Sequence, residues 1–205
     1  TNDDLQALAR ELPPKLSAFH NDVMMNGALF DRLKHVEASG EDFTPEQEMM
    51  LSDLLSSFER NGASLSETDQ QRLRDIDRDL STCSPEFAEN VLKATQSYAM
   101  WIAGPECVAP LPDSAKNVAK EAAEQDGRPA EWKFTLDAPS FMAFMTYIED
   151  ESLRKEMWTA FSSKCVKGEY QNQDLIQRIL KLRYERAQLL GYRDHAHYTL
   201  ERRMV

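Results

Sequence analysis

Apolar side chains recur at intervals of three and four residues along most of this 205-residue chain, and that spacing is what most constrains its fold. Residues at these intervals lie on one face of an α-helix, so each such run predicts a helix with one buried stripe. The chain also has only 7 Gly, and few glycines disfavour the many tight turns that a fold of short strands would need. The sequence therefore predicts an all-α fold, mainly of antiparallel long helices, with at most one or two short β-strands near residues 132–136.

Three helices are predicted in the first part of the chain, residues 1–97, which we expect to form an array of helical hairpins. The first spans residues 14–36, and the side chains expected on its buried stripe are Leu16, Phe19, Val23, Phe30 and Leu33. The second opens at Thr44, which begins a capping box. The third runs to about residue 94, with a kink or a restart at Pro85, because proline removes a helix hydrogen bond.

The composition changes after residue 97. Residues 98–130 are expected to form an irregular linker and one short helix, because glycine and proline gather there. Residues 131–205 are expected to begin with a short strand, since apolar and polar side chains alternate over 132–136, and to continue as helices. The helices predicted in this last part span residues 140–148, 151–163 and 174–190, and a further one starts at about 194.

Charge, hydropathy and cysteine content disfavour several classes of protein. The net charge of -11 repels phosphate backbones, so no nucleic-acid partner is expected. No apolar run approaches the roughly 20 residues that a membrane-spanning helix needs, so no membrane partner is expected. Cys83, Cys107 and Cys165 are odd in number and widely spaced, which disfavours a disulfide framework and fits a reducing cytoplasm.

The four histidines do not form a recognised metal-binding motif. They are His20, His35, His195 and His197, and none is followed by Glu, so H-E-x-x-H does not occur. His195 and His197 are a tempting pair, but residues two apart on a helix face different directions and cannot hold one metal ion. On a strand the two side chains could hold one metal ion, yet the flanking pattern is helical and favours a capping or surface role for both histidines. We therefore predict no metal ligand and no catalytic residue in this chain.

Two further groups have both a functional and a structural interpretation. The acidic run Glu149, Asp150 and Glu151 could act chemically, but negative charge at the start of a helix is stabilising and explains it sufficiently. An aromatic cluster could line a ligand groove, although core packing at a strand-to-helix corner is favoured. Its members are Trp132, Phe134, Phe141, Phe144 and Tyr147. Neither group identifies a substrate-binding residue.

Two stretches go beyond a generic helical pattern. Residues 132–141 have the sequence WKFTLDAPSF, and residues 175–192 have the sequence LIQRILKLRYERAQLLGY. In this order they resemble the zinc oligopeptidases of the thimet oligopeptidase, oligopeptidase A and peptidyl-dipeptidase family, and the resemblance extends over nearly the whole chain. Cys165 departs from the family pattern, which has a small residue there.

The resemblance implies a mechanism for a longer parent protein. Family members bind one zinc ion through the two histidines of H-E-x-x-H and a downstream Glu, and the Glu of the motif activates the zinc-bound water. All of these residues lie C-terminal to the matched region, so none is carried over. The resemblance implies that this N-terminal helical part forms one wall of a channel that admits short unfolded peptides, that its partner is the parent's own C-terminal catalytic domain, and that it holds no zinc itself.

Three interpretations stay open from the sequence. The chain is either a fragment of a zinc oligopeptidase, inactive alone, or a standalone helical binding or scaffold module without catalysis, or a small enzyme that uses a thiol or carboxylates. A fragment should expose an apolar face where the catalytic domain would dock. An H-E-x-x-H motif encoded downstream in the same reading frame would favour the first.

Overall fold

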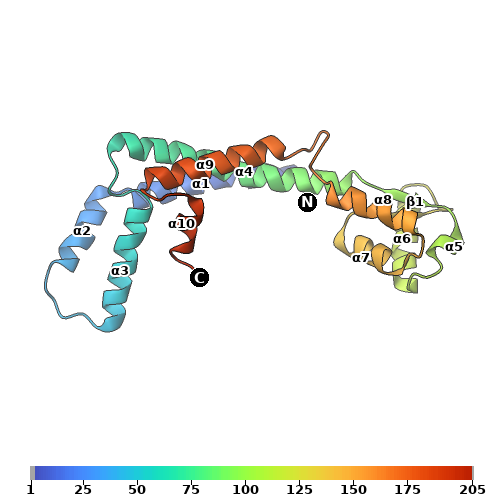
Figure 1. Cartoon of the computed structure of the whole chain (residues 1–205), viewed down its shortest axis with the longest axis horizontal. Helices are drawn as coiled ribbons and strands as arrows, with labels where there is room; N and C mark the ends of the chain where they lie inside the picture. Colours follow the sequence, from blue (N-terminus) through green and yellow to red (C-terminus); the bar gives the residue numbers. More distant parts are fainter. Residues whose placement is uncertain (1–2, 205) are drawn as a thin grey trace. The chain divides into compact units, whose positions relative to one another are not determined.

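The computed structural model describes residues 3–204, and over these residues it is mainly helical (Figure 1). The only sheet in the described part has two antiparallel strands, so the predicted mainly α fold is confirmed. None of the described helices combines the length and the apolar character that crossing a membrane requires.

Contacts divide the chain into two compact units. Residues 1–86 and 175–205 form one unit, and residues 87–174 form the other. The long helix α4 contributes to both, with the division directly after Glu86. The three segments expected from the sequence, 1–97, 98–130 and 131–205, follow composition rather than contacts and stay a prediction.

The first unit is built from helices alone. Its helices are α1 (Asp3–Met24), α2 (Gly27–Glu37), α3 (Pro45–Arg60), the first part of α4 (Glu67–Gln96), most of α9 (Gln173–Leu189) and α10 (His195–Leu200). The predicted capping box at the start of α3 is confirmed, because the Thr44 hydroxyl accepts a hydrogen bond from Gln47 N and the Gln47 side chain accepts one from Thr44 N. Helices α2 and α3 pack through Phe30, Leu55 and Phe58, with the rings of Phe30 and Phe58 stacked 5.9 Å apart.

The single helix predicted over residues 14–36 is wrong in its bounds. Helix α1 begins at Asp3, passes through Pro13 and Pro14 and ends at Met24, and α2 then starts at Gly27. The break has a local cause, since the Asn26 side chain accepts a hydrogen bond from Leu29 N at 3.0 Å and caps a new helix.

The stripe expected to be buried on that helix is also mostly wrong. Phe30 is buried, but Leu16 and Phe19 are 65% and 68% exposed and Val23 is 37% exposed. Leu5, Leu8 and Leu12 continue the same stripe towards the start of α1 and are exposed as well. Helix α1 therefore carries an apolar face, made of Leu5, Leu8, Leu12, Leu16, Phe19 and Val23, that its own unit leaves open.

Helix α4 runs unbroken from Glu67 to Gln96 with Pro85 inside it, so the alternative of a restart at that proline is wrong. Fully buried side chains at Leu73, Ile76 and Cys83 hold the turns that precede Pro85. That packing offsets the hydrogen bond that the proline cannot donate.

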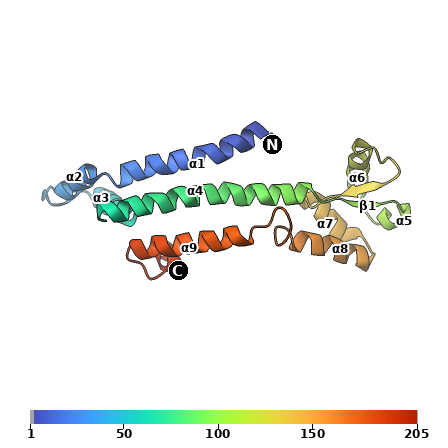
Figure 2. The ribbon, with the colours of Figure 1, turned by 90° about the horizontal axis from the view of Figure 1, so that it is seen from above.

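Helix α9 lies antiparallel beside the first part of α4, as Figure 2 shows. Both carboxylate oxygens of Glu185 accept hydrogen bonds from Arg72, at 2.6 and 2.7 Å. Further along, the two helices are joined by the ion pairs Arg186–Asp77 at 2.7 Å and Arg178–Asp79 at 3.1 Å. The ladder of opposite charges fixes the register of α9 on α4.

The second unit surrounds a small sheet. Within residues 98–130, the part before the predicted short helix was expected to be irregular, but it contains a strand and a further short helix. This correction follows from strand pairing, since Met100 lies opposite Phe134 and Ile102 opposite Trp132. A strand of three residues gives little alternation in sequence, and its partner is about thirty residues away. The elements are β1 (Met100–Ile102), α5 (Pro105–Val108), α6 (Asp113–Gln125), β2 (Trp132–Phe134), α7 (Ala138–Tyr147) and α8 (Glu151–Ser162).

Candidate functional site

The two histidines considered as a metal pair lie on the short helix α10 and have different environments. His197 Nδ1 lies 2.9 Å from Asp194 Oδ1, and Asp194 caps the helix by accepting from His197 N. The hydrogen bond from His197 N, the strongest of several, holds the pKa of Asp194 well below its usual range. The His195 ring instead stacks on Tyr198, with Nε2 3.5 Å from the Thr199 hydroxyl. The two rings make separate structural contacts, in line with the capping or surface role favoured from the sequence.

The other two histidines also make local contacts. His35 Nδ1 lies 2.8 Å from the carbonyl oxygen of Asp31, and His20 Nε2 lies 3.5 Å from the side-chain oxygen of Asn61. Among residues 3–204, no three side chains of His, Cys, Asp or Glu come together in a way that could hold a metal ion. The described residues therefore offer no ligand set to build on.

Two of the three cysteines have thiols that burial makes less reactive. Cys83 is fully buried, and burial, the largest influence, raises the pKa of its thiol. Burial likewise raises the pKa of the Cys165 thiol, although Lys164 opposes it. A thiol with a raised pKa is less ionised at neutral pH, and the thiolate is the nucleophile. Cys165 has φ 59°, a left-handed conformation that favours a residue without a Cβ.

The acidic run before α8 has a structural role. The Asp150 carboxylate accepts hydrogen bonds from Ser152 N at 2.8 Å and Leu153 N at 3.2 Å and so caps the helix. The hydrogen bond from the Ser152 side chain, followed by that from Leu153 N, lowers the pKa of Asp150. The Arg154 guanidinium donates to the carbonyl of Glu149 at 2.8 Å and fastens the turn before the helix.

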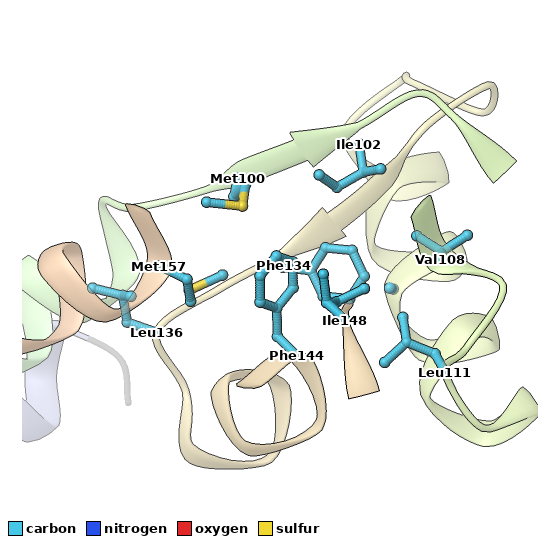
Figure 3. Packing of buried hydrophobic residues seen from close by; sticks show 10 residues of the cluster. Met100, Ile102, Val108, Leu111, Phe134, Leu136, Phe144, Ile148 and Met157 are labelled. Atoms are coloured by element: carbon cyan, nitrogen blue, oxygen red, sulfur yellow. The ribbon is translucent and has the colours of Figure 1, made fainter. Parts of the chain in front are cut away.

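Most of the aromatic cluster forms the core of the second unit. Phe134 and Phe144 are buried and meet edge to face, with centroids 4.8 Å apart. Figure 3 shows buried side chains from β1 and α8, among them Met100 and Met157, gathered around these two rings. Phe141 stacks on Phe161 at 3.9 Å. Core packing is thus confirmed as the role of these phenylalanines.

One hollow adjoins that core. It lies between α6, β2 and α7, has a volume of about 570 Å³, and is lined mainly by small or apolar side chains such as Ala115, Val118 and Ala143. Val118 at its edge is 66% exposed. The lining has apolar surface for a ligand or a neighbouring segment. Of its two charged side chains, Lys133 pairs with Asp126 at 2.7 Å, and the Asp137 carboxylate accepts a hydrogen bond from the Thr135 hydroxyl at 3.0 Å.

The polar cluster that the sequence did not reveal lies where the C-terminal segment meets α3. Arg60 donates to the hydroxyl of Tyr192 at 2.8 Å and to the carbonyl oxygen of Tyr198 at 2.6 Å, and it pairs with Glu201. Its guanidinium lies 4.2 Å from the centroid of the Tyr198 ring. Only 11% of the Arg60 side chain is exposed, so these contacts replace most of the water that would otherwise solvate its guanidinium group.

A second arginine contacts the same tyrosine ring. The guanidinium of Arg186 lies 5.0 Å from the Tyr198 centroid and donates to Asp77 at 2.7 Å. Burial, the largest single influence, lowers the pKa of Arg186, but the charges of Asp77 and Tyr198 and the hydrogen bonds with both together outweigh it, so the pKa is raised overall. No spacing pattern could have revealed this cluster, because Arg60 and Tyr192 are 132 residues apart.

Comparisons with known proteins agree with the resemblance found in the sequence. Residues 144–205 match the model of peptidase family M3. Oligopeptidase A of Haemophilus influenzae is 33% identical over an alignment of 199 positions, which covers 94% of this chain and 29% of that protein. Oligopeptidase A of Salmonella typhimurium is 35% identical over an alignment of 167 positions, which covers 78% of this chain and 24% of that protein.

A relative named for a different peptidase activity matches a similar share of the chain. Dipeptidyl carboxypeptidase of Salmonella typhimurium is 27% identical over an alignment of 208 positions including gaps, which covers 100% of this chain and 31% of that protein. The chain thus spans less than a third of the length of each of these three relatives. Together with the ordered motifs at residues 132–141 and 175–192, these matches show that the chain belongs to peptidase family M3.

Proposed function

We propose that this chain is a helical part of a zinc-dependent oligopeptidase that hydrolyses short peptides in the cytoplasm, and that hydrolysis requires polypeptide outside these 205 residues. The observation that carries the proposal is a contrast in coverage. Oligopeptidase A of Haemophilus influenzae matches 94% of this chain but only 29% of its own length, while H-E-x-x-H occurs nowhere in the 205 residues. The single zinc ion and the general base would then belong to the remaining polypeptide of the parent.

In this proposal the chain contributes shape. Its long helices would form one wall of a channel over the zinc site, narrow enough to admit short unfolded peptides and to exclude folded proteins. The side chains facing the peptide would come from these helices, and the chemistry from the catalytic domain that is their partner.

The open apolar face of α1 supports a partner of that kind. Its six large side chains follow helical spacing over about five turns, and each is at least 37% exposed. An isolated soluble protein rarely leaves so continuous an apolar surface in water, whereas a surface that another part of the same polypeptide covers would have this composition.

A peptidase assay tests the proposal. The 205-residue chain and the product of its complete reading frame are purified and given a short fluorogenic peptide and, separately, a folded protein. We expect the complete product alone to cleave the peptide, and neither sample to cleave the folded protein. Turnover of the peptide by the 205-residue chain would contradict the proposal, and a complete reading frame without H-E-x-x-H would favour a non-catalytic helical module.

A further inference from the structure

Helix α3 has a second apolar face that its own packing does not use. The face towards α2 carries Leu55 and Phe58, which are buried with Phe30. On the other face, Met49 and Met50 are each 64% exposed. They line a shallow, wide-open hollow of about 640 Å³ on the surface of α3, which alone supplies its lining: Pro45, Glu46, Met49, Met50, Asp53, Leu54 and Ser57.

The C-terminal segment of the chain runs along α3 towards this hollow. The carbonyl oxygen of Tyr198 is bound by Arg60, at the end of α3. Four residues later, Arg202 donates to Asp53 at 3.1 Å and to the Ser56 hydroxyl at 2.5 Å. Arg202 therefore contacts α3 before Arg60, towards the N-terminal end of that helix, since Asp53 and Ser56 lie about 10 and 6 Å before Arg60 along the helix axis.

Asp53 binds Arg202, which anchors the C-terminal segment on α3, and it also lines the hollow. Its carboxylate holds Arg202, and it lines the hollow together with Met49 and Met50, one helical turn further on. From Asp53 to Pro45 the helix rises about 12 Å, which roughly four extended residues can cover.

We propose that the polypeptide following residue 205 in the parent protein continues along α3 and covers Met49, Met50 and Leu54. This inference rests on the proposed function, since it requires a parent that extends beyond this chain. The segment would place apolar side chains against the two methionines. A basic side chain near its end would face Glu46, which lies at the rim of the hollow.

Methionine oxidation measures the proposed burial directly. Limited hydrogen peroxide treatment followed by peptide mass spectrometry gives a rate for each methionine in three proteins: the 205-residue chain, the same chain extended by about twenty residues of its own reading frame, and the complete product. We expect oxidation of Met49 and Met50 to slow at least about fivefold in both longer proteins, because a covered thioether is less accessible to peroxide.

Two controls make the result specific. Met142 is 60% exposed, close to the value for Met49 and Met50, and lies in the other unit, so its rate should be unchanged in the extended chain. In the extended chain, Arg202→Ala should restore oxidation of Met49 and Met50 because it removes the anchor. Arg203→Ala, at the exposed neighbouring position, should leave the protection in place.

Equal oxidation rates of Met49 and Met50 in the 205-residue chain and the complete product would overturn the inference, and the complete product supplies this result even where the extended chain precipitates. Protection in the 205-residue chain that disappears on dilution would also overturn it, because a second copy would then be the occupant. Peptide hydrolysis by the complete product is scored separately. Hydrolysis with unprotected methionines would refute this inference alone, and a complete product without the zinc motif would refute the proposed function.

Discussion

At the scale of single residues, most of the groups that the sequence offered for chemistry proved to stabilise local structure. Asp150 and Asp194 each cap a helix, and His197 joins the cap at Asp194. These roles were predictable because charge and position relative to a helix start are visible in sequence. The contacts of Arg60 and Arg186 with Tyr198 were not, because they depend on which distant helices lie side by side.

The ion pair between Arg186 and Asp77 gives a first prediction. Replacing Arg186 with Ala leaves the Asp77 carboxylate buried without its partner, which costs about 3 kcal/mol of unfolding free energy. Urea denaturation followed by circular dichroism measures the change. Arg178→Ala is the matched control on the same pair of helices, since its partner Asp79 is more exposed and the loss should be below about 1 kcal/mol. Equal losses for the two variants would contradict this assignment of the buried pair.

His195 gives a pH dependence with a defined sign. Burial first, and then the charges of Arg183 and Arg186, lower the pKa of His195 from 6.5, while Asp194 opposes them. The folded state therefore binds a proton less readily than the unfolded state. The contribution of neutral His195 to stability is complete above pH 6.5 and is lost as the pH falls from 6.5 towards the lowered pKa.

Urea denaturation midpoints measured at several pH values between about pH 8 and pH 5 test this pH dependence. His195→Gln should remove part of the decline at the acidic end, whereas His35→Gln, on the exposed face of α2, serves as the control. An unchanged decline in the His195 variant would show that this ring does not couple protonation to folding.

At the scale of secondary-structure elements, local signals predicted helix starts well and helix packing poorly. The capping box at Thr44 was visible because both partners are three residues apart. The break at Asn26 was missed because the apolar interval continues across it. The interval also predicted burial of Leu16 and Phe19, yet periodicity reports only that a helix has an apolar face, not that its own unit covers that face.

The cap at Asn26, which starts α2 after the break that follows α1, gives a prediction about stability. Asn26→Ala should lower the unfolding free energy by about 1 kcal/mol, because Leu29 N loses its acceptor. Asn26→Asp keeps an acceptor at the same place and should cost far less. Denaturation of both variants beside the unchanged chain measures the difference, and a loss of the same size in the Asp variant would argue against the capping role.

At the scale of the whole molecule, sequence motifs and comparisons identify the family, and the residues present limit what this chain can do. The match to oligopeptidase A covers 94% of the chain, and the described residues bring no group of three potential metal ligands together. Membership of family M3 could be predicted because residues 132–141 and 175–192 have specific motifs in order. The exposure of the apolar face of α1, and the contacts of the C-terminal segment with α3, could not be predicted from the sequence, because each depends on how distant parts of the chain pack in three dimensions.

The proposed division of labour, with a helical wall here and zinc chemistry in the remaining polypeptide, is tested most directly by metal content. The 205-residue chain and the complete reading-frame product are incubated with zinc, dialysed and analysed by elemental mass spectrometry. We predict about one zinc ion per complete product and less than about a tenth of that in the 205-residue chain. One tightly held zinc ion per 205-residue chain, lost on replacing His195 or His197, would contradict the proposed division.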